Sequence, residues 1–497
     1  MSETLIMIED APAPRTVPYS FARKHGVLLR QGSAGIECVH RAGAGLDGLL
    51  EVQRIAPGAP LVAVTDEAFD AALSQTFSDR AGAAADFDLG DMDLAALADS
   101  AASVDDLLDT RDDAPVIRLI NALLLEAVKE GASDVHIETQ EKRLVVRFRI
   151  DGVLRDMIEP PRALAPLLVS RIKVMAKLDI AERRVPQDGR VTLRIGGHDV
   201  DARVSTIPTQ HGERVVLRLL EKGSLRLDLS GLGMSERDRD VFGRLLERPH
   251  GILLVTGPTG SGKTTTLYTA LTRLNDRKRN VMTVEDPIEY ELAGVAQTQV
   301  NPRTDMTFAR GLRAILRQDP DVIMVGEIRD HETAQVAVRS AMTGHFVLST
   351  LHTNSAVGSV TRLIDMGVER YLLAPMVVGL VAQRLVRKLC PTCSWEDTAT
   401  EADSLLLGGA LKPGKRLRRS LGCDECHGEG YRGRAGLYEV VAVDEKLQKL
   451  IHDGASEAEL ERIARKNNPS LLDDGVAKVR AGMTTVDEVA RVVRDEA

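Results

Sequence analysis

The stretch "GPTGSGKTTT", residues 257–266, decides the fold of the larger part of this chain. Its first eight residues match the pattern G-x-x-x-x-G-K-[ST] in full. The apolar "GILLVT" before it predicts a strand, and "KTTTLYTALTRLN" from Lys263 onward predicts a helix, which is the context that a phosphate loop requires. Glycines let backbone N–H groups converge on phosphates, and the helix N-terminus adds its positive end. The sequence therefore predicts a nucleoside triphosphate site on an α/β sheet.

The chemistry of such a loop assigns roles to its side chains. We expect Lys263 to reach the β- and γ-phosphates of ATP and Thr264 to coordinate Mg²⁺. Hydrolysis further needs an acid near the Mg²⁺ and a carboxylate that orients the attacking water. The predicted nucleotide-binding residues are Gly257, Pro258, Thr259, Gly260, Ser261, Gly262, Lys263, Thr264 and Thr265.

Length and charge limit what the rest of the chain can be. A chain of 497 residues is too long for one core, so we expect three or four domains. The net charge of −9 arises between residues 86 and 113, which hold ten Asp and one basic residue, Arg111. We interpret this run as a solvated linker. The remainder is close to neutral, which argues against broad electrostatic binding of nucleic acid.

Apolar patterning before the phosphate loop predicts an α+β domain. "PVIRLINALLLEAVKEGA" (115–132) has helical spacing, and "LVVRFRIDGVLRDM" (144–157) alternates around a turn at Asp151-Gly152. "VTLRIGGHDVDARVSTIP" (191–208) repeats that hairpin pattern with a turn at Gly196-Gly197. Between the two hairpins we expect a helix from about Arg162 to Ile180.

From the phosphate loop onward, strand candidates alternate with helices, at 252–256, 281–284, 322–325 and 346–349. This alternation predicts an α/β sheet with crossover helices, and the tail from about Asp444 is expected to be helical. The longest apolar stretch, "YLLAPMVVGLVA" (371–382), is about half of a membrane span. The start, "MSETLIMIEDAPAPR", lacks the features of a signal peptide, so we expect a cytoplasmic protein that reaches membranes through partners.

Three polar clusters follow or flank these strands. They are "TVEDPIEY" (283–290), "DPDVIMVGEIRD" (319–330) and "GHFVLSTLHTN" (344–354). The carboxyl ends of parallel strands meet at one edge of a sheet, so acids there would face the phosphate loop. Each cluster alone could be a cap or a loop carboxylate, but three after a phosphate loop favour a hydrolytic site.

The phosphate loop and these three clusters resemble the Walker A, Asp, Walker B and His boxes of the secretion ATPase superfamily, which drives type II secretion, type IV pili and related machines. The resemblance extends from residue 116 to the end. It implies a RecA-like P-loop ATPase domain preceded by a PAS-like α+β domain and a small N-terminal domain, and followed by a zinc insert and a helical region. The expected boundaries are 1–85 for the N-terminal docking domain, 86–115 for the acidic linker, 116–222 for the α+β domain, 223–234 for a second linker, 235–388 for the ATPase core, 389–430 for the tetracysteine insert and 431–497 for the helical region.

The resemblance also implies roles for single residues. Glu289 matches the acid that activates water, and Glu327 matches the Walker B acid that holds Mg²⁺. This Walker B has no Asp at the last strand position, so the metal role falls on Glu327. His345 and His352 match the His box, whose expected task is to sense the γ-phosphate.

Two arginines of the preceding domain complete the implied site. The phosphate site supplies only one cation of its own, Lys263, whereas charge on the transferring phosphoryl group usually needs an arginine as well. The superfamily places that role on positions matching Arg203 and Arg218. From the residues alone, the favoured interpretation is that both are ordinary solvated strand residues, and only the resemblance implies the catalytic role. The resemblance further implies a homohexamer whose hydrolysis rises with assembly.

Four of the five cysteines form two CxxC pairs, Cys390 with Cys393 and Cys423 with Cys426, separated by 29 residues. Each pair can present two thiolates from one tight turn, so the sequence predicts a closed, structural Cys₄ zinc site. A redox pair is the alternative, although neither pair opens a helix after a βαβ strand. Cys38 stands alone, and we expect it to be a small buried apolar residue.

The N-terminal sequence indicates which type of secretion or pilus machine the chain serves. "PYSFARKHGVLL" (18–29) resembles the start of the first domain of type II secretion ATPases, although a plain amphipathic core helix is the alternative. The resemblance implies docking on the cytoplasmic domain of the bitopic inner-membrane platform protein L, with the polytopic platform protein F as a further partner. We therefore expect a type II secretion motor, peripheral on the inner membrane. The alternatives are a type IV pilus assembly ATPase, an ATP-gated scaffold with little turnover, and a nucleic-acid translocase, which the charge disfavours.

Overall fold

The computed structural model divides the chain into two compact units, residues 1–126 with 191–200 and residues 127–190 with 201–497. It describes residues 25–32, 35–66, 113–195, 198–221 and 227–493, together with a few single positions among the first hundred. The acidic linker expected over 86–115 lies mostly outside these ranges. Half of the stretch 18–29 that bears on docking lies outside them as well.

The described part of the N-terminal domain contains a small three-stranded sheet and a helix. Its elements are β1 (Val27–Gly32), β2 (Gly35–Arg41), α2 (Leu46–Ile55) and β3 (Leu61–Val64). β2 is the central strand and pairs antiparallel with β1 and parallel with β3. Cys38 on β2 is fully buried in the apolar core, and burial raises its pKa. The expectation that Cys38 is a buried apolar residue is therefore confirmed.

The α+β domain contains a six-stranded sheet in the order β6-β5-β4-β9-β8-β7. The strands are β4 (Ala132–Thr139), β5 (Leu144–Ile150), β6 (Val153–Ile158), β7 (Gln187–Ile195), β8 (His198–Thr209) and β9 (Gly212–Glu221). Helix α5 (Asp113–Lys129) precedes them. The predicted turn at Asp151-Gly152 is confirmed, and both of its residues have positive φ, 50° and 88°. The Gly196-Gly197 turn lies outside the described residues.

The inserted helix is shorter than expected. After a 3₁₀ turn at Arg162–Leu164, α6 runs only over Ala165–Met175, not to Ile180. Lys177 is in the left-handed region, with φ 57°, which ends the helix. The fully buried Lys173 donates to the carbonyl oxygen of Glu182 at 2.8 Å, so the segment that follows folds back onto the helix.

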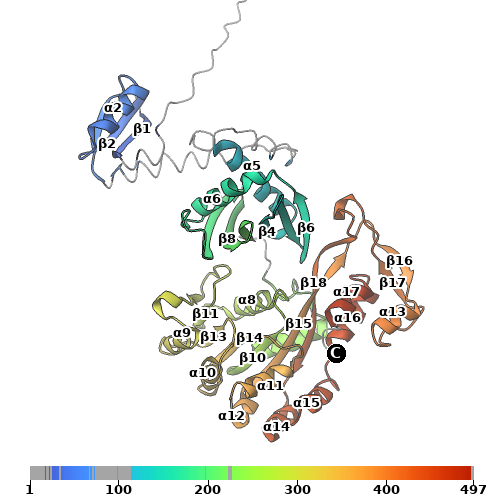
Figure 1. Ribbon diagram of the computed structural model, residues 1–497. Helices are drawn as coiled ribbons and strands as arrows, with labels where there is room; N and C mark the ends of the chain where they lie inside the picture. Colours follow the sequence, from blue (N-terminus) through green and yellow to red (C-terminus); the bar gives the residue numbers. More distant parts are fainter. Residues whose placement is uncertain are drawn as a thin grey trace, which may run out of the picture. The chain divides into compact units, whose positions relative to one another are not determined.

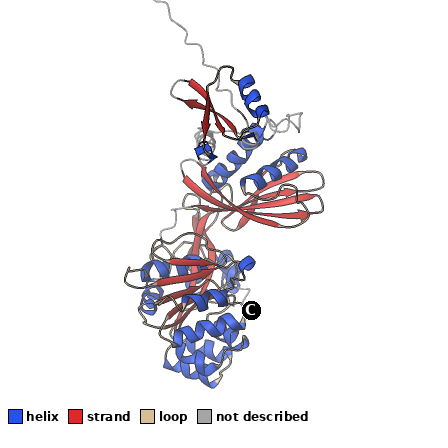
Figure 2. Cartoon of the chain, turned by 90° about the vertical axis from the view of Figure 1, so that its left-hand side faces the viewer, coloured by secondary structure: helices blue, strands red, loops and turns tan. Residues whose placement is uncertain are grey.

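The ATPase domain is built on a sheet with helices packed beside it (Figures 1 and 2). The sheet has seven strands in the order β12-β11-β13-β14-β10-β15-β18. The strands are β10 (Gly251–Thr256), β11 (Val281–Glu285), β12 (Ala296–Gln299), β13 (Val322–Val325), β14 (Phe346–Leu351), β15 (Val377–Leu389) and β18 (Tyr431–Ala442). These strands pair in parallel, except that β18 runs antiparallel to β15. The four strand candidates of this region are confirmed.

Helices cover both faces of this sheet, which explains why its strands are continuously apolar. On β10, Ile252 and Leu254 belong to one core cluster, and Leu253 and Val255 belong to the cluster on the other side. The covering helices are α7 (Glu236–Leu246), α8 (Lys263–Leu274), α9 (Phe308–Ile315), α10 (His331–Met342), α11 (Gly358–Asp365) and α12 (Arg370–Met376).

The sheet continues past the position where the ATPase core was expected to end. Residues 431–442, assigned from the sequence to a helical region, form strand β18. The apolar stretch 371–382 divides into most of α12 and the first half of β15. A strand buried on both faces does not alternate, so its apolar run could not be distinguished from a helix by period.

The cysteine-bearing insert connects β15 to β18. It contains β16 (Trp395–Thr398), α13 (Glu401–Leu406) and β17 (Arg416–Arg419). Its apolar side chains share a core cluster with α16 (Leu471–Arg480) and α17 (Val486–Val493). The helical tail is confirmed, with α14 (Glu445–Asp453) and α15 (Glu457–Ala464) preceding that pair. Within the described ranges, no helix combines the length and apolar character needed to cross a membrane.

Candidate nucleotide site and zinc centre

The phosphate loop has the backbone that its glycines predict. It joins the end of β10 at Thr256 to the start of α8 at Lys263, and Gly257, Gly260 and Gly262 have φ of 150°, 80° and 86°. A Cβ on Gly257 would lie 2.4 Å from the carbonyl oxygen of Gln383, and one on Gly262 would lie 2.8 Å from its Nε2. Gln383 on β15 thus lies directly against the loop, and both positions need glycine.

The side chains of the loop fit a triphosphate. Lys263 Nζ donates to the carbonyl oxygens of Gly257 at 2.7 Å and Pro258 at 3.0 Å, and burial lowers its pKa to about 8. The hydroxyl of Ser261 is buried and has no hydrogen-bond partner among the described residues. Thr264, in the first turn of α8, is exposed and lines the same cavity. A buried ammonium, an unpaired hydroxyl and a helix N-terminus match the donor set that phosphates need, and Thr264 supplies an oxygen for Mg²⁺.

The Asp box contains one buried acid and two accessible ones. Glu285, the last residue of β11, is 3% exposed and accepts hydrogen bonds from Tyr268, Thr283 and Gln297. Glu289 lies in the loop after β11, with its side chain 30% exposed and in the cavity. Glu289 and the exposed Asp286 both line the cavity and can meet a water molecule there, whereas Glu285 could do so only by losing internal hydrogen bonds.

The Walker B acid lies at the same edge of the sheet. Glu327 follows β13, and its Oε1 lies 2.5 Å from Arg329 Nη2. Its Oε2 lies 3.6 Å from His352 Nε2, which follows β14. Burial, followed by the charge of Lys263, lowers the pKa of His352, so the neutral imidazole is favoured near neutral pH. These positions agree with a metal-holding Glu327 and a His352 near the γ-phosphate.

His345, in contrast, lies at the wrong end of its strand. It precedes β14, and its carbonyl oxygen accepts the N–H of Gly251, the first residue of β10. The phosphate loop follows the other end of β10, a full strand length away. The imidazole Nδ1 lies 2.9 Å from the carbonyl oxygen of Ser340 and 3.1 Å from Thr343 Oγ1. The expected γ-phosphate role of His345 is therefore wrong, because the two His box residues flank opposite ends of one strand.

Both predicted arginines of the α+β domain line the cavity. Arg203 on β8 places Nη1 3.5 Å from Glu289 Oε2, and burial lowers its pKa. Arg218 on β9 places Nε 2.9 Å from Oδ1 of Asp134, its cross-strand neighbour. The alternative that they are ordinary solvated strand residues does not describe Arg203, which is partly buried against the candidate base.

Two arginines that the sequence analysis missed lie close to the phosphate loop and to Glu327, so the expectation that Lys263 is the only cation of the phosphate site is wrong. Arg329 contacts Glu327, and Arg384 lies on β15. Arg384 is 5% exposed and donates hydrogen bonds to the carbonyl oxygens of Gln383 and Asn354. It lies against the phosphate loop, because a Cβ added to Gly257 would be 3.2 Å from Arg384 Nη1. Its identification would have required β15 to be recognised as the strand beside the phosphate loop.

The candidate catalytic residues other than His345 line one cavity of about 1230 Å³ within the second compact unit. The ATPase domain contributes the phosphate loop, Glu289, Glu327 and His352, and the α+β domain contributes the two predicted arginines. The arrangement joins a phosphate cradle, metal ligands, a carboxylate base and cations, which are the groups needed for phosphoryl transfer to water.

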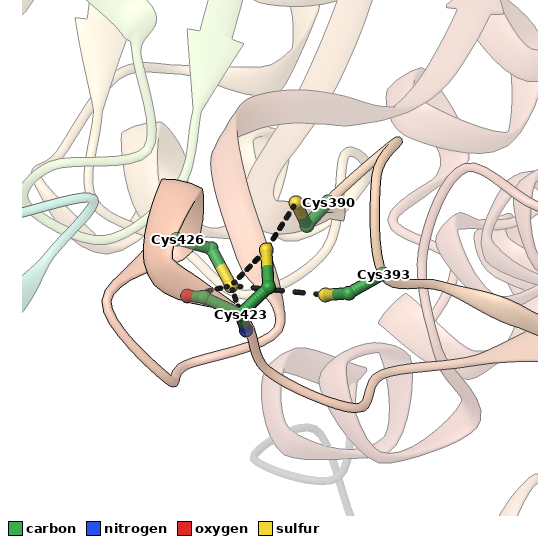
Figure 3. A group of neighbouring side chains, drawn as sticks. All are labelled: Cys390, Cys393, Cys423 and Cys426. Carbon is green, nitrogen blue, oxygen red and sulfur yellow. Dashed lines mark hydrogen bonds between the residues drawn. The ribbon is translucent and has the colours of Figure 1, made fainter.

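The four cysteines of the insert converge on one point (Figure 3). Their sulfur atoms all lie within 4.8 Å of one another, with Sγ–Sγ distances of 3.9 Å for Cys390–Cys423 and 3.7 Å for both Cys393–Cys426 and Cys423–Cys426. Four sulfurs at about 2.3 Å from a tetrahedral Zn²⁺ would be about 3.8 Å apart. All four thiols are unbridged, and the N–H of Gly430 donates to Cys426 Sγ at 3.1 Å. The cluster fits a structural metal such as zinc.

Sequence comparisons identify two matching families. The family described as "Type II/IV secretion system protein" matches residues 109–491, and a domain family of "GSPII protein E" matches residues 16–77. Type II secretion system protein E of Pseudomonas aeruginosa is 58% identical, with 98% of each chain covered. Type II secretion system ATPase E of Vibrio cholerae is 52% identical, with 100% of each chain covered.

Solved structures share the fold over about three quarters of the chain. The ATPase DotB of Legionella pneumophila has a TM-score of 0.57 at 21% identity, with 76% of this chain and 95% of DotB covered. The pilus retraction motor PilT with bound ADP has a TM-score of 0.52 at 25% identity, with 75% of this chain and 96% of PilT covered. The P-loop ATPase fold expected from the sequence is thereby confirmed.

Proposed function

This chain belongs to the Type II/IV secretion system protein family, and from that premise we propose that it is the ATP-hydrolysing motor of a type II secretion system. The observation that carries the proposal is the shared cavity, which holds the phosphate loop, Glu289, Glu327 and the two arginines of the α+β domain. A protein that only bound nucleotide would not need a carboxylate and an arginine paired beside the phosphate loop.

Each residue has a definite task in the proposed reaction. Lys263 and the backbone N–H groups of the loop bind the β- and γ-phosphates, while Thr264 and Glu327 hold Mg²⁺, which supplies charge neutralisation when bound. Glu289 orients the attacking water and accepts its proton. Arg203 and Arg218 stabilise the charge that develops on the transferring phosphoryl group, and His352 responds to the γ-phosphate.

We further propose that the motor works as a homohexamer. Arg203 and Arg218 come from the α+β domain, so their placement depends on how that domain is held against an ATPase domain. Assembly would fix this placement, and hydrolysis would then rise with protein concentration until the ring is complete. Movement of the α+β domain during the nucleotide cycle would drive assembly of a pseudopilus.

The proposed partners follow from the N-terminal domain. The match to a domain of GSPII protein E over residues 16–77 supports docking on the cytoplasmic domain of platform protein L, with platform protein F as a second contact. This would place the protein on the cytoplasmic face of the inner membrane. The same match favours type II secretion over the alternative of a type IV pilus assembly motor, and no nucleic-acid partner is proposed.

Hydrolysis is tested by substituting the candidate base. Glu289→Gln should lower kcat by about 10²-fold or more while ATP binding persists, because the amide cannot accept a proton. The matched control is Glu291→Gln, two residues further along the loop and exposed, which should behave as wild type. Lys263→Ala should lose nucleotide binding. Unchanged secretion by cells carrying Glu289→Gln would favour the ATP-gated scaffold, whereas unchanged ATP turnover would remove Glu289 from the role of base.

The machine is tested in cells that lack the endogenous gene for this protein. Restoration of exoprotein in the medium without restoration of surface pili supports the secretion motor. The reverse pattern would assign the same catalytic residues to a pilus motor.

A further inference from the structure

Tyr268 is a fully buried tyrosine on the helix that begins at the phosphate loop. It lies five residues after Lys263 on α8, and its hydroxyl donates to Oε2 of Glu285 at the end of β11. Burial, followed by the charge of Glu285, raises the pKa of Tyr268. The hydroxyl therefore stays protonated and remains a donor.

The partner of this hydroxyl is an acid with almost no access to solvent. Glu285 also accepts from Thr283 Oγ1 at 2.5 Å and from Gln297 Nε2 at 3.0 Å, on its Oε1. With the bond from Tyr268, both carboxylate oxygens have donors from α8, β11 and β12. A buried carboxylate satisfied in this way forms a rigid network, because the loss of any donor leaves a buried acceptor short of a partner.

The network also holds the backbone of the loop that carries Glu289. The N–H of Glu289 donates to the Tyr268 hydroxyl at 3.3 Å. Gln297 holds the same loop further on, because its Oε1 accepts the N–H of Leu292 at 2.7 Å and its Nε2 donates to the carbonyl oxygen of Tyr290 at 3.3 Å. The candidate base is therefore anchored through its main chain, while its side chain stays free to meet water and Arg203.

We propose that Tyr268 is a positioning residue for the hydrolytic step, and that its single hydroxyl fixes the main chain of Glu289 relative to the helix that binds the phosphates. The inference rests on the proposed function. The hydroxyl oxygen connects the phosphate-binding helix to the loop that carries the base. These two parts must keep the same relative position during hydrolysis. General-base catalysis depends on geometry, and a misplacement of about 1 Å can cost about 10²-fold in rate.

The test is Tyr268→Phe in the full-length assembled protein. It keeps the ring and removes every hydrogen bond of the hydroxyl. We expect kcat to fall at least about tenfold, with KM for ATP and the affinity for a fluorescent ATP analogue within about twofold of wild type. Assembly and thermal midpoint are measured on the same samples.

The matched control is Tyr290→Phe. The two rings pack edge to face with centroids 4.5 Å apart, and the Tyr290 hydroxyl is buried without a hydrogen-bond partner among the described residues. Its removal deletes the same atoms from the same cluster without breaking a bond, so kcat should stay within about twofold of wild type.

Three outcomes overturn the inference: wild-type kcat in Tyr268→Phe, a rise in KM that accounts for the whole loss, or an equal loss in Tyr290→Phe. If Tyr268→Phe does not fold, Glu285→Gln serves as the second variant, and it must show the same selective loss of kcat. Glu289→Gln is measured in parallel. If Glu289→Gln turns over ATP as wild type does, the base role of Glu289 in the proposed function fails, whereas loss of turnover in Glu289→Gln beside wild-type kcat in Tyr268→Phe overturns only the inference.

Discussion

Arg203 and Glu289, 86 residues apart in the chain, meet across the cavity with 3.5 Å between Nη1 and Oε2. Glu289 is the proposed base and belongs to the ATPase domain, and Arg203 comes from the α+β domain. The pair thus joins the two domains at the point where water would be activated. A nucleotide γ-phosphate entering beside this pair would compete with Glu289 for the guanidinium, so the two charges can exchange partners during turnover.

Substitution of this arginine should affect chemistry more than binding. Arg203→Ala is expected to lower kcat by about 10²-fold or more, since arginines that stabilise phosphoryl-transfer transition states are worth about 10³–10⁵ in rate. The measurement is phosphate release by the assembled protein. The control is Arg143→Ala, because Arg143 pairs with Glu159 on the surface of the same domain and does not line the cavity. A kcat within twofold of wild type would remove Arg203 from the site.

The two histidines should separate clearly. His352→Ala is expected to reduce kcat by about tenfold or more, because His352 lies beside Glu327 in the cavity. His345→Ala should leave kcat within about twofold and change only stability, by about 1 kcal/mol, through the lost hydrogen bond to Ser340. Steady-state kinetics and thermal midpoints of both variants check this. Equal losses of kcat in the two variants would mean that the catalytic role of each histidine does not depend on whether it precedes or follows β14.

The stability contributed at Lys263 should depend on pH. Burial lowers the pKa of this ammonium from 10.5 to about 8. This shift means that burying the charged form costs at most about 3 kcal/mol of folding stability. Below pH 8 the lysine is charged in both folded and unfolded states, so its burial cost is present in full. Between pH 8 and 10.5 the folded state loses the proton first, and this cost declines as the pH rises.

Lys263→Met should therefore gain more stability relative to wild type at pH 7 than at pH 10. Urea unfolding without nucleotide at the two pH values measures the difference, with the exposed Lys278→Met as control. If the change in unfolding free energy from wild type to Lys263→Met is the same at both pH values, the pKa of Lys263 is not lowered in the folded state.

The cysteine cluster should bind one metal ion. Native mass spectrometry should find about one Zn²⁺ per chain, which is lost with a strong chelator and in Cys423→Ser, together with a fall in thermal midpoint. Cys38→Ala, at the fifth cysteine, should retain the metal because Cys38 is buried in the N-terminal domain. Wild-type mass without zinc, or a full zinc content in Cys423→Ser, would argue instead for free or redox-active thiols.

Local sequence was a sound guide wherever the chemistry is local. The phosphate loop, its strand and its helix are contiguous, so glycine spacing and apolar period predicted them together. The two CxxC pairs also allowed the metal site to be predicted. Each pair sets its own sulfur spacing, and the fold has only to bring the two turns together. The Asp151-Gly152 hairpin was likewise predicted from one alternating stretch.

Prediction failed where the answer depended on strand ends or on distant neighbours. His345 and His352 look equivalent in the sequence, but only the residue after a parallel strand reaches the edge that holds the phosphate loop. β15 was missed because a strand that is buried on both faces shows no alternation of apolar and polar residues. Gln383 and Arg384, which lie on β15 against the phosphate loop, were therefore missed as well.

By itself the sequence determined that this chain has a phosphate loop on an α/β sheet, acids after the neighbouring strands and a four-cysteine cluster, because each is encoded by residues close together. Only the tertiary structure decided which of these acids is buried, which histidine faces the cavity and which arginines surround it. Burial, strand order and pairing are properties of contacts between segments tens to hundreds of residues apart, and no local pattern carries them.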